Sequence, residues 1–189
     1  VAPLSDDLPP NILDQNGLDI RSMDYALDGT LAVIARHSGE AGIWLAEAGK
    51  PLHQLLRLPV CGCGLRWSPD GTRFSYFVTT SGGFRVSVLT RGGAPVAQVV
   101  SAHDIGSVDW SADGNSLLMT RRDAKGWRLW RMDLTRPDKS VPVSPYGWKF
   151  VRVSGNMMFG VKSGATGIWR MDGKPRRLTD WPDETGWWA

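Results

Sequence analysis

The chain has 189 residues, enough for one well-buried domain and at most two, and its 42% hydrophobic and 22% charged residues are typical of a folded protein. The net charge of +3 lacks the clustered Lys and Arg of a dedicated nucleic-acid binder, so we expect no direct nucleic-acid binding by this segment. No window approaches the roughly 18 consecutive apolar residues of a membrane span. We therefore expect membrane attachment only through a segment outside this chain.

Two landmarks recur along the chain at a fixed interval. Asp-Gly pairs stand at Asp28-Gly29, Asp70-Gly71 and Asp113-Gly114, which are 42 and then 43 residues apart. Asp-Gly favours a tight reversal between strands, because Gly takes the positive φ that such turns require. A second landmark follows each turn, at Ile43-Trp44, Val86-Ser87, Leu129-Trp130 and Ile168-Trp169. A fourth, altered copy of the turn has Gly155, 41 residues after Gly114. Two landmarks that recur together through four copies indicate a repeat of about 42 residues.

Each repeat predicts four short antiparallel strands, and such units bury their faces by packing radially as propeller blades. We expect blades at residues 20–60, 61–102, 103–145 and 146–180, an outer strand of a preceding blade or a linker at 1–19, and the start of a further blade at 181–189. The fold class is therefore all-β, a β-propeller segment of about four four-stranded blades, and an incomplete propeller. Residues expected to fill the gaps between blades are Tyr25, Trp67, Trp110 and Phe150, together with Trp44, Trp130 and Trp169.

The chain begins Val1-Ala2-Pro3-Leu4, without an initiator Met and without the basic and apolar start of a signal peptide. We therefore expect a processed product or a segment of a longer protein.

The turn motif resembles that of a known repeat family. Trp67-Ser68-Pro69-Asp70-Gly71, with Trp110-Ser111-Ala112-Asp113-Gly114 one repeat later and a Leu178-Thr179 ending, resembles the TolB-type propeller repeat over about residues 20 to 180. The fourth repeat departs from the pattern because it lacks Asp-Gly, and the first has Ala26-Leu27 where Ser-Pro is usual. The resemblance implies a periplasmic or otherwise extracytoplasmic protein. The segment from Gly167 to Pro182 is most similar to the propeller part of CadC-type winged-helix regulators, which are membrane-anchored.

Enzymatic chemistry finds little support in the residues. The three histidines, His37, His53 and His103, accompany no Gly-x-Ser-x-Gly elbow, so we expect no catalytic triad and no enzyme. Acids around the propeller channel, such as Asp24 and Asp109, offer another route to catalysis. The equivalent positions of the other repeats are expected to be Arg66 and Lys149, which argues against that route.

Cys61 and Cys63 are separated by one residue, with no further Cys or His at zinc-site spacing. They are either two small residues of a Gly-rich loop or a redox or metal pair, and their oxidation state stays open. We expect no cofactor and no metal.

In a propeller, the loops before the first strand and between the second and third strands emerge on one face. We call the residues expected there the predicted partner face: Arg36, His37, His103, Asp104, Arg121, Arg122, Lys125, Trp148 and Lys149, with Cys61, Cys63 and Asp123 beside them. These charges are either solvated loop residues or a surface for a protein partner or a small anionic ligand. His37 and His103 would make such a surface pH-sensitive. We predict a non-enzymatic binding or sensing module, which would be the sensor part of a membrane-anchored transcriptional regulator. The alternative is the gating propeller of a prolyl-oligopeptidase-type serine peptidase.

Overall fold

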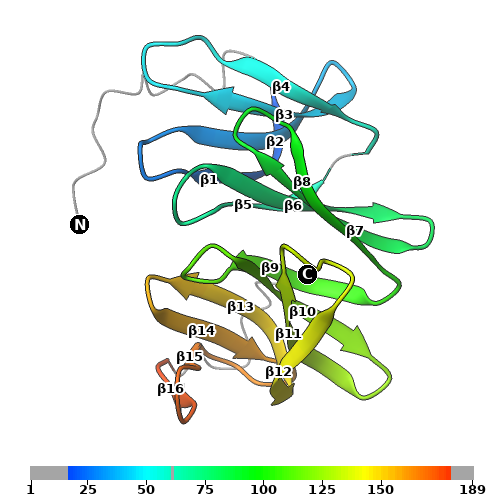
Figure 1. Cartoon of the computed structure of the whole chain (residues 1–189), viewed down its shortest axis with the longest axis vertical. Helices are drawn as coiled ribbons and strands as arrows, with labels where there is room; N and C mark the ends of the chain where they lie inside the picture. The colour runs from blue at the N-terminus through cyan, green and yellow to red at the C-terminus, as the bar shows by residue number, and fades with distance from the viewer. Residues whose placement is uncertain (1–16, 61, 180–189) are drawn as a thin grey trace.

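The computed structural model describes residues 17–60 and 62–179, and in this part of the chain every regular element is a β-strand (Figure 1). The strands form four antiparallel sheets of four, and within each sheet neighbouring strands follow one another along the chain. The first blade comprises β1 (Asp19–Tyr25), β2 (Leu31–His37), β3 (Glu40–Ala46) and β4 (His53–Leu58), and the second β5 (Cys63–Trp67), β6 (Arg73–Thr80), β7 (Gly83–Thr90) and β8 (Pro95–Ser101). The third comprises β9 (Asp104–Trp110), β10 (Ser116–Asp123), β11 (Gly126–Asp133) and β12 (Ser140–Tyr146), and the fourth β13 (Trp148–Ser154), β14 (Met157–Lys162), β15 (Trp169–Arg170) and β16 (Arg176–Arg177).

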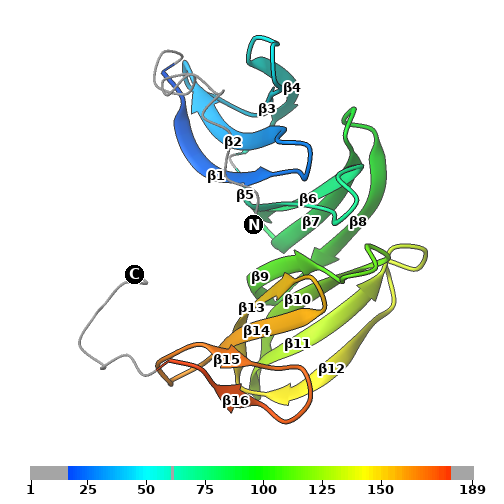
Figure 2. The same cartoon turned by 90° about the vertical axis from the view of Figure 1, so that its left-hand side faces the viewer.

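Figure 2 shows the four sheets fanned around an axis, with the first strand of each blade innermost. The arc stays open between the first and fourth blades. The predicted all-β propeller segment of four-stranded blades is thereby confirmed. The strands proposed before residue 17 and after residue 179 lie outside the described residues.

The Ser-x-Asp-Gly turns are held by their own side chains. The Ser68 hydroxyl donates to the Asp70 carboxylate at 2.5 Å and accepts the Arg73 N–H at 3.0 Å, and Ser111 makes the same two kinds of bond in the third blade. Gly71 takes a φ of 68°, a conformation that a residue with a Cβ rarely adopts. The turn sequence therefore fixes where the first strand ends and the second begins.

Three of the four hydrophobic clusters in the described residues lie between blades, and the fourth lies in the first blade. The second strands of the second and third blades are buried on both faces, because one face packs on the preceding blade and the other on the following blade. Between the first and second blades, Ile34 and Ile43 pack with Leu65, Trp67 and Phe74. The next two interfaces are smaller versions of the same arrangement, built around Trp110 and then around Val151.

Strand pairing corrects one expectation for the fourth blade. Trp67 pairs with Phe74 and Trp110 with Leu117, whereas Val153 pairs with Met158 in the fourth blade. Val153 therefore takes the place that was expected for Phe150. The reason is a shorter hairpin: Ser154 already pairs with Met157, so the strand runs closer to its turn than in the other repeats.

Candidate functional site

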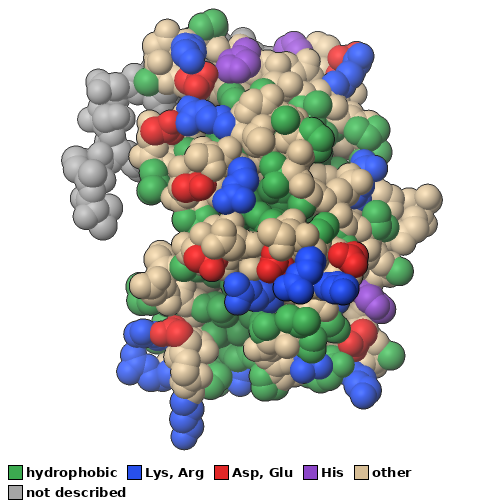
Figure 3. Space-filling model, viewed as in Figure 1, with side chains coloured by type: hydrophobic (Ala, Val, Ile, Leu, Met, Phe, Trp, Pro, Cys, Tyr) green, Lys and Arg blue, Asp and Glu red, His purple; other side chains and the backbone are tan. Residues whose placement is uncertain are grey.

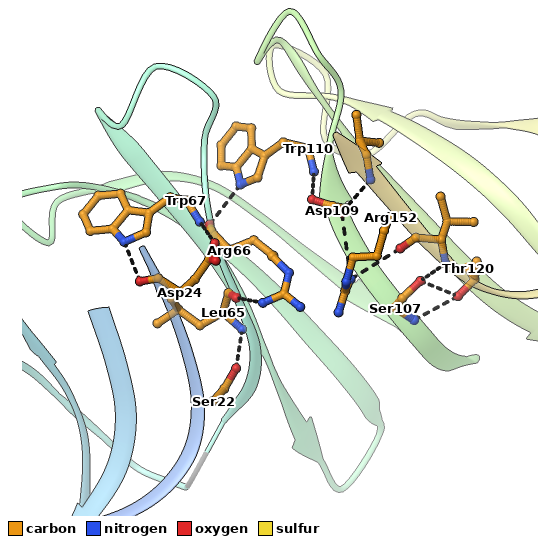
Figure 4. A network of polar contacts seen from close by, with 12 residues as sticks. Ser22, Asp24, Leu65, Arg66, Trp67, Ser107, Asp109, Trp110, Thr120 and Arg152 are labelled. Carbon is orange, nitrogen blue, oxygen red and sulfur yellow. Dashed lines mark hydrogen bonds and ion pairs between the residues drawn. The ribbon is translucent and has the colours of Figure 1, made fainter. Parts of the chain in front are cut away.

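The inner strands are joined by side chains that accept backbone hydrogen bonds across blades (Figure 4). In the first blade, the Ser22 hydroxyl accepts the Leu65 N–H at 3.0 Å, and the Asp24 carboxylate accepts the Trp67 N–H at 2.8 Å. Ser22 and Asp24 are two residues apart on β1, so both point the same way. The two side chains thus supply the hydrogen-bond acceptors that a neighbouring strand would otherwise offer to the N–H groups of β5.

The third blade repeats this arrangement on the fourth. Ser107 accepts the Val151 N–H and Asp109 accepts the Val153 N–H, each at 3.0 Å. Thr120 on β10 adds a third contact between these blades, because its hydroxyl donates to the Lys149 carbonyl at 2.6 Å. We call such a set of side-chain hydrogen bonds from one blade to the inner strand of the next a joint. A Ser-x-Asp pair in the first and third blades thus holds the blade that follows.

Asp109 is only 7% exposed, and its carboxylate accepts a second backbone N–H, from Trp110 at 2.8 Å. Burial raises the pKa of Asp109, while the hydrogen bonds from Val153 and Trp110 and the charge of Arg152 oppose that shift. The backbone bonds occupy the oxygens that a general base or a metal ligand would need. The role of Asp24 and Asp109 visible in the structure is to anchor neighbouring blades.

In the second and fourth blades, the position equivalent to Asp24 and Asp109 is occupied by an arginine. Since Trp67 and Val153 are equivalent by their hydrogen bonds, the equivalent residues before them are Arg66 and Arg152, and not Lys149 as expected from the sequence. The prediction of Lys149 takes Phe150 as the counterpart of Trp67, whereas the pairing of Ser154 with Met157 places Val153 there and Arg152 before it. The inner strands therefore carry Asp, Arg, Asp and Arg in turn.

The two guanidinium groups have few acidic partners. Arg66 donates to the Leu65 carbonyl at 2.7 Å, and no ion pair to it occurs among the described residues. Arg152 donates to the Val151 carbonyl at 3.3 Å and lies 3.9 Å from the Asp109 carboxylate. Burial lowers the pKa of Arg152, and the positive charge of Arg66 lowers it further, against the opposing charges of Asp109 and Asp24. Two cations thus face the same space.

That space is a cavity of about 570 Å³, which we call the inner cavity. Its wall includes Asp24, Arg66, Asp109 and Arg152, with Trp67, Trp110 and the turn residues Leu27, Pro69 and Ala112. Because the turns between first and second strands line it, the cavity lies toward the end of the blades opposite the predicted partner face. A guanidinium presents five N–H donors in a planar fork that matches a carboxylate or phosphate, so the arrangement can bind an anionic group.

The structure gathers part of the predicted partner face in the third blade. Asp104 pairs with Arg122 where β9 begins and β10 ends, and the exposed His103 precedes them. Asp123 accepts hydrogen bonds from the Lys125 N–H and from the Tyr146 hydroxyl. These residues form one polar edge of the third blade.

The other members differ in exposure. Arg121 is half-buried, with its guanidinium 4.0 Å from the centre of the Trp130 ring, and burial lowers its pKa against the opposing charge of Asp123. Trp148 is 4% exposed and packs edge-on against Trp169, so it supports this surface from below. Lys149 is half-buried beside the Phe150 ring. Arg36 and His37 are exposed at the end of β2, in the first blade.

Charges on the surface are mixed in sign. On the side drawn in Figure 3, Lys and Arg side chains gather near the middle of the molecule and are flanked by Asp and Glu side chains. Within residues 17–60 and 62–179, no group of three or more His, Cys, Asp or Glu side chains could hold a metal ion. The same residues contain no helix that is long and apolar enough to cross a membrane. Cys63 is exposed at the start of β5, and Cys61 lies outside the described residues.

No protein-family model and no curated protein matches the sequence. Solved structures do share the fold. The chain is similar to a putative TolB from Agrobacterium tumefaciens, with a TM-score of 0.65 and 17% identity over 83% of this chain and 64% of that one. It is similar to TolB from Acinetobacter baumannii, with a TM-score of 0.69 and 16% identity over 86% of this chain and 44% of that one. It is also similar to an acylaminoacyl peptidase from Pyrococcus horikoshii, with a TM-score of 0.55 and 13% identity over 86% of this chain and 32% of that one.

These matches show that the fold is a TolB-like β-propeller. The chain spans less than two thirds of the length of either TolB structure.

Proposed function

We propose that the chain is a non-enzymatic binding module whose inner cavity takes an anionic group, a carboxylate or a phosphate, from a protein partner or a small ligand. The observation that carries this proposal is the pair of Arg66 and Arg152 in one cavity of about 570 Å³. The carboxylates of Asp24 and Asp109 accept backbone N–H groups, and Asp109 also lies 3.9 Å from the Arg152 guanidinium, so a bound anion would share Arg152 with Asp109 while Arg66 has no ion pair among the described residues. An anion between two arginines would also relieve their mutual repulsion.

Titration calorimetry with citrate and with inorganic phosphate tests the proposal. We expect saturable binding that weakens with added salt, and a loss of about tenfold for Arg66→Gln or Arg152→Gln, because a hydrogen bond to a charged group contributes roughly 1.5–3 kcal/mol. The matched control is Arg36→Gln with Arg122→Gln on the predicted partner face, which should leave the affinity unchanged. If only the control pair weakens binding, the anion surface is the predicted partner face. If no variant does, the anion-binding function is wrong.

The larger context of the module is a proposal that rests on sequence resemblance. The TolB-type repeat around Trp67-Ser68-Pro69-Asp70-Gly71 supports an extracytoplasmic place, and the segment from Gly167 onward supports the sensor part of a membrane-anchored regulator of the CadC type. Reading the coding sequence on both sides of this chain tests this. A winged helix and a membrane span upstream would support the regulator, and their absence from the full gene would exclude it.

The second candidate is the gating propeller of a serine peptidase. It is favoured by the likeness in fold to an acylaminoacyl peptidase, of which this chain covers 32%. A peptidase would need a hydrolase domain with a Gly-x-Ser-x-Gly elbow in the same gene. The same reading of the gene decides between the two candidates.

A further inference from the structure

Two tryptophans occupy equivalent places between blades. The Trp67 ring lies between the first and second blades, and its Nε1 donates to the Asp24 carbonyl at 3.1 Å. The Trp110 ring lies between the second and third blades, and its Nε1 donates to the Arg66 carbonyl at 3.0 Å. The rings are 6% and 2% exposed, so each fills its gap. A buried indole with its N–H on the inner-strand carbonyl of the preceding blade is therefore a repeated feature of this fold.

The third interface has the acceptor but not the indole. Asp109 holds the place of Asp24 and Arg66, because its carboxylate receives the Val153 N–H as that of Asp24 receives the Trp67 N–H. Val153 then stands where an indole would be expected, and Met158 takes the place that Phe74 has opposite Trp67. A smaller side chain at both positions leaves space between the third and fourth blades.

The space is present as a cavity of about 710 Å³, which we call the interblade cavity. Its apolar wall is formed by Leu118, Leu129, Trp148, Val153, Met158 and Met171. Small-molecule sites in proteins have volumes of about 300–1,000 Å³ and mostly apolar linings with a few polar groups. Methionine sulfurs also make favourable contacts with aromatic rings. Size and lining both suit an aromatic ligand.

We propose that the interblade cavity binds a small planar aromatic molecule with one N–H donor, of about the size of indole. The ring lies between Leu118 and Met158, in the place that Trp67 and Trp110 take in the other interfaces. Its N–H donates to the main-chain carbonyl of Asp109. This site adjoins the inner cavity: Ala112, Val153 and Gly155 line both, and Asp109, which lines the inner cavity, pairs with Leu118 of the interblade cavity. The proposal does not depend on anion binding.

Titration of the chain with indole and with 1-methylindole, followed by ligand-observed NMR, tests the site without any substitution. We expect saturable binding of indole and binding of 1-methylindole that is about fivefold weaker, the ratio that corresponds to one hydrogen bond of roughly 1 kcal/mol. Non-saturable binding, or equal affinity for the two compounds, would overturn the proposal.

Substitution at Val153 gives an independent readout. Val153→Trp should fill the cavity with the chain's own indole, abolish binding and raise the melting temperature. Val100→Trp, on the exposed outer strand β8, adds an indole elsewhere and should leave indole binding unchanged. If Val153→Trp still binds indole as the unmodified chain does, or lowers the melting temperature, no indole-shaped vacancy exists at this position.

Discussion

The Asp109 carboxylate accepts the backbone N–H of Val153 at 3.0 Å, and so a single side chain joins the inner strands of two blades. Asp109 is almost fully buried and also accepts the Trp110 N–H, whereas Asp24, its counterpart in the first blade, is only partly buried and its carboxylate accepts one backbone N–H. The two contacts are therefore alike in their hydrogen bonds to the next blade and unequal in burial.

Asp109→Ala should lower the free energy of unfolding by about 3 kcal/mol, because it leaves the buried Trp110 N–H and the partly buried Val153 N–H without partners, at roughly 1–3 kcal/mol each. Asp24→Ala should lower it by about half as much, since water can reach its site. Urea unfolding of both variants measures the difference. Equal losses would show that the buried joint has no special importance.

The turn aspartate Asp70 should make the protein acid-sensitive. The hydrogen bond from the Ser68 hydroxyl is the main reason that the pKa of Asp70 falls from 3.8 to about 2. A carboxyl whose pKa is depressed on folding stabilises the folded state above its unfolded pKa, and that contribution is lost as the pH falls through the folded pKa. Stability should therefore decrease between about pH 4 and pH 2, and less steeply in Asp70→Asn. Thermal melts across this pH range provide the measurement, and identical slopes in both proteins would contradict it.

Arg91 connects the first two blades. Its guanidinium donates to Asp28 at 2.5 Å and to Glu47 at 3.0 Å, both in the first blade. Since the side chain is about a third exposed, solvent screens these ion pairs, and we expect Arg91→Ala to cost about 1 kcal/mol, less at high salt. Arg57, an exposed partner of Glu40, is the matched control, and Arg57→Ala should cost under about 0.5 kcal/mol. Chemical unfolding at two salt concentrations would reveal whether the two arginines differ.

Gly106 marks a close approach of the third and fourth blades. A Cβ at Gly106 would collide with the Lys149 carbonyl of the next inner strand, and backbone atoms there cannot move aside without separating the blades. Gly106→Ala should therefore destabilise the fold by about 1–3 kcal/mol, the usual cost of overpacking. Gly82→Ala, at a loop glycine with no heavy atom within 4 Å of the added Cβ, should have little effect. If Gly106→Ala leaves the free energy of unfolding unchanged, the third and fourth blades can move apart without loss of stability.

The local features of the fold could be predicted from the sequence. Asp-Gly turns and apolar second strands depend on neighbouring residues, so the strand order and the four-stranded blades followed from the pattern around Asp70-Gly71. The register of the fourth blade could not be predicted from its glycine, because the hairpin at Gly155 is shorter than the others. For the same reason the sequence pattern predicts Lys149 at the position that Arg152 occupies in the structure.

The candidate sites depend on contacts between repeats, which sequence periodicity does not describe. Ser22 and Asp24 look like ordinary polar residues of a strand, and only packing places them under the N–H groups of β5. The spacing of Ser22-x-Asp24 and Ser107-x-Asp109 was a signal for the joints, because polar pairs at matching places in alternate repeats need a shared cause.

The alternation of aspartate and arginine along the inner strands has a consequence for how the chain can change in evolution. Asp24 and Asp109 each hold the next blade, whereas the intervening Arg66 contributes only its backbone carbonyl to its neighbour through Trp110. Duplicating or deleting one blade would place two like charges side by side, with repulsion in place of neutrality. Duplicating two blades together would keep both the joints and the charge balance. The unit that repeats in charge along the inner strands is therefore a pair of blades, although the structural unit is one blade.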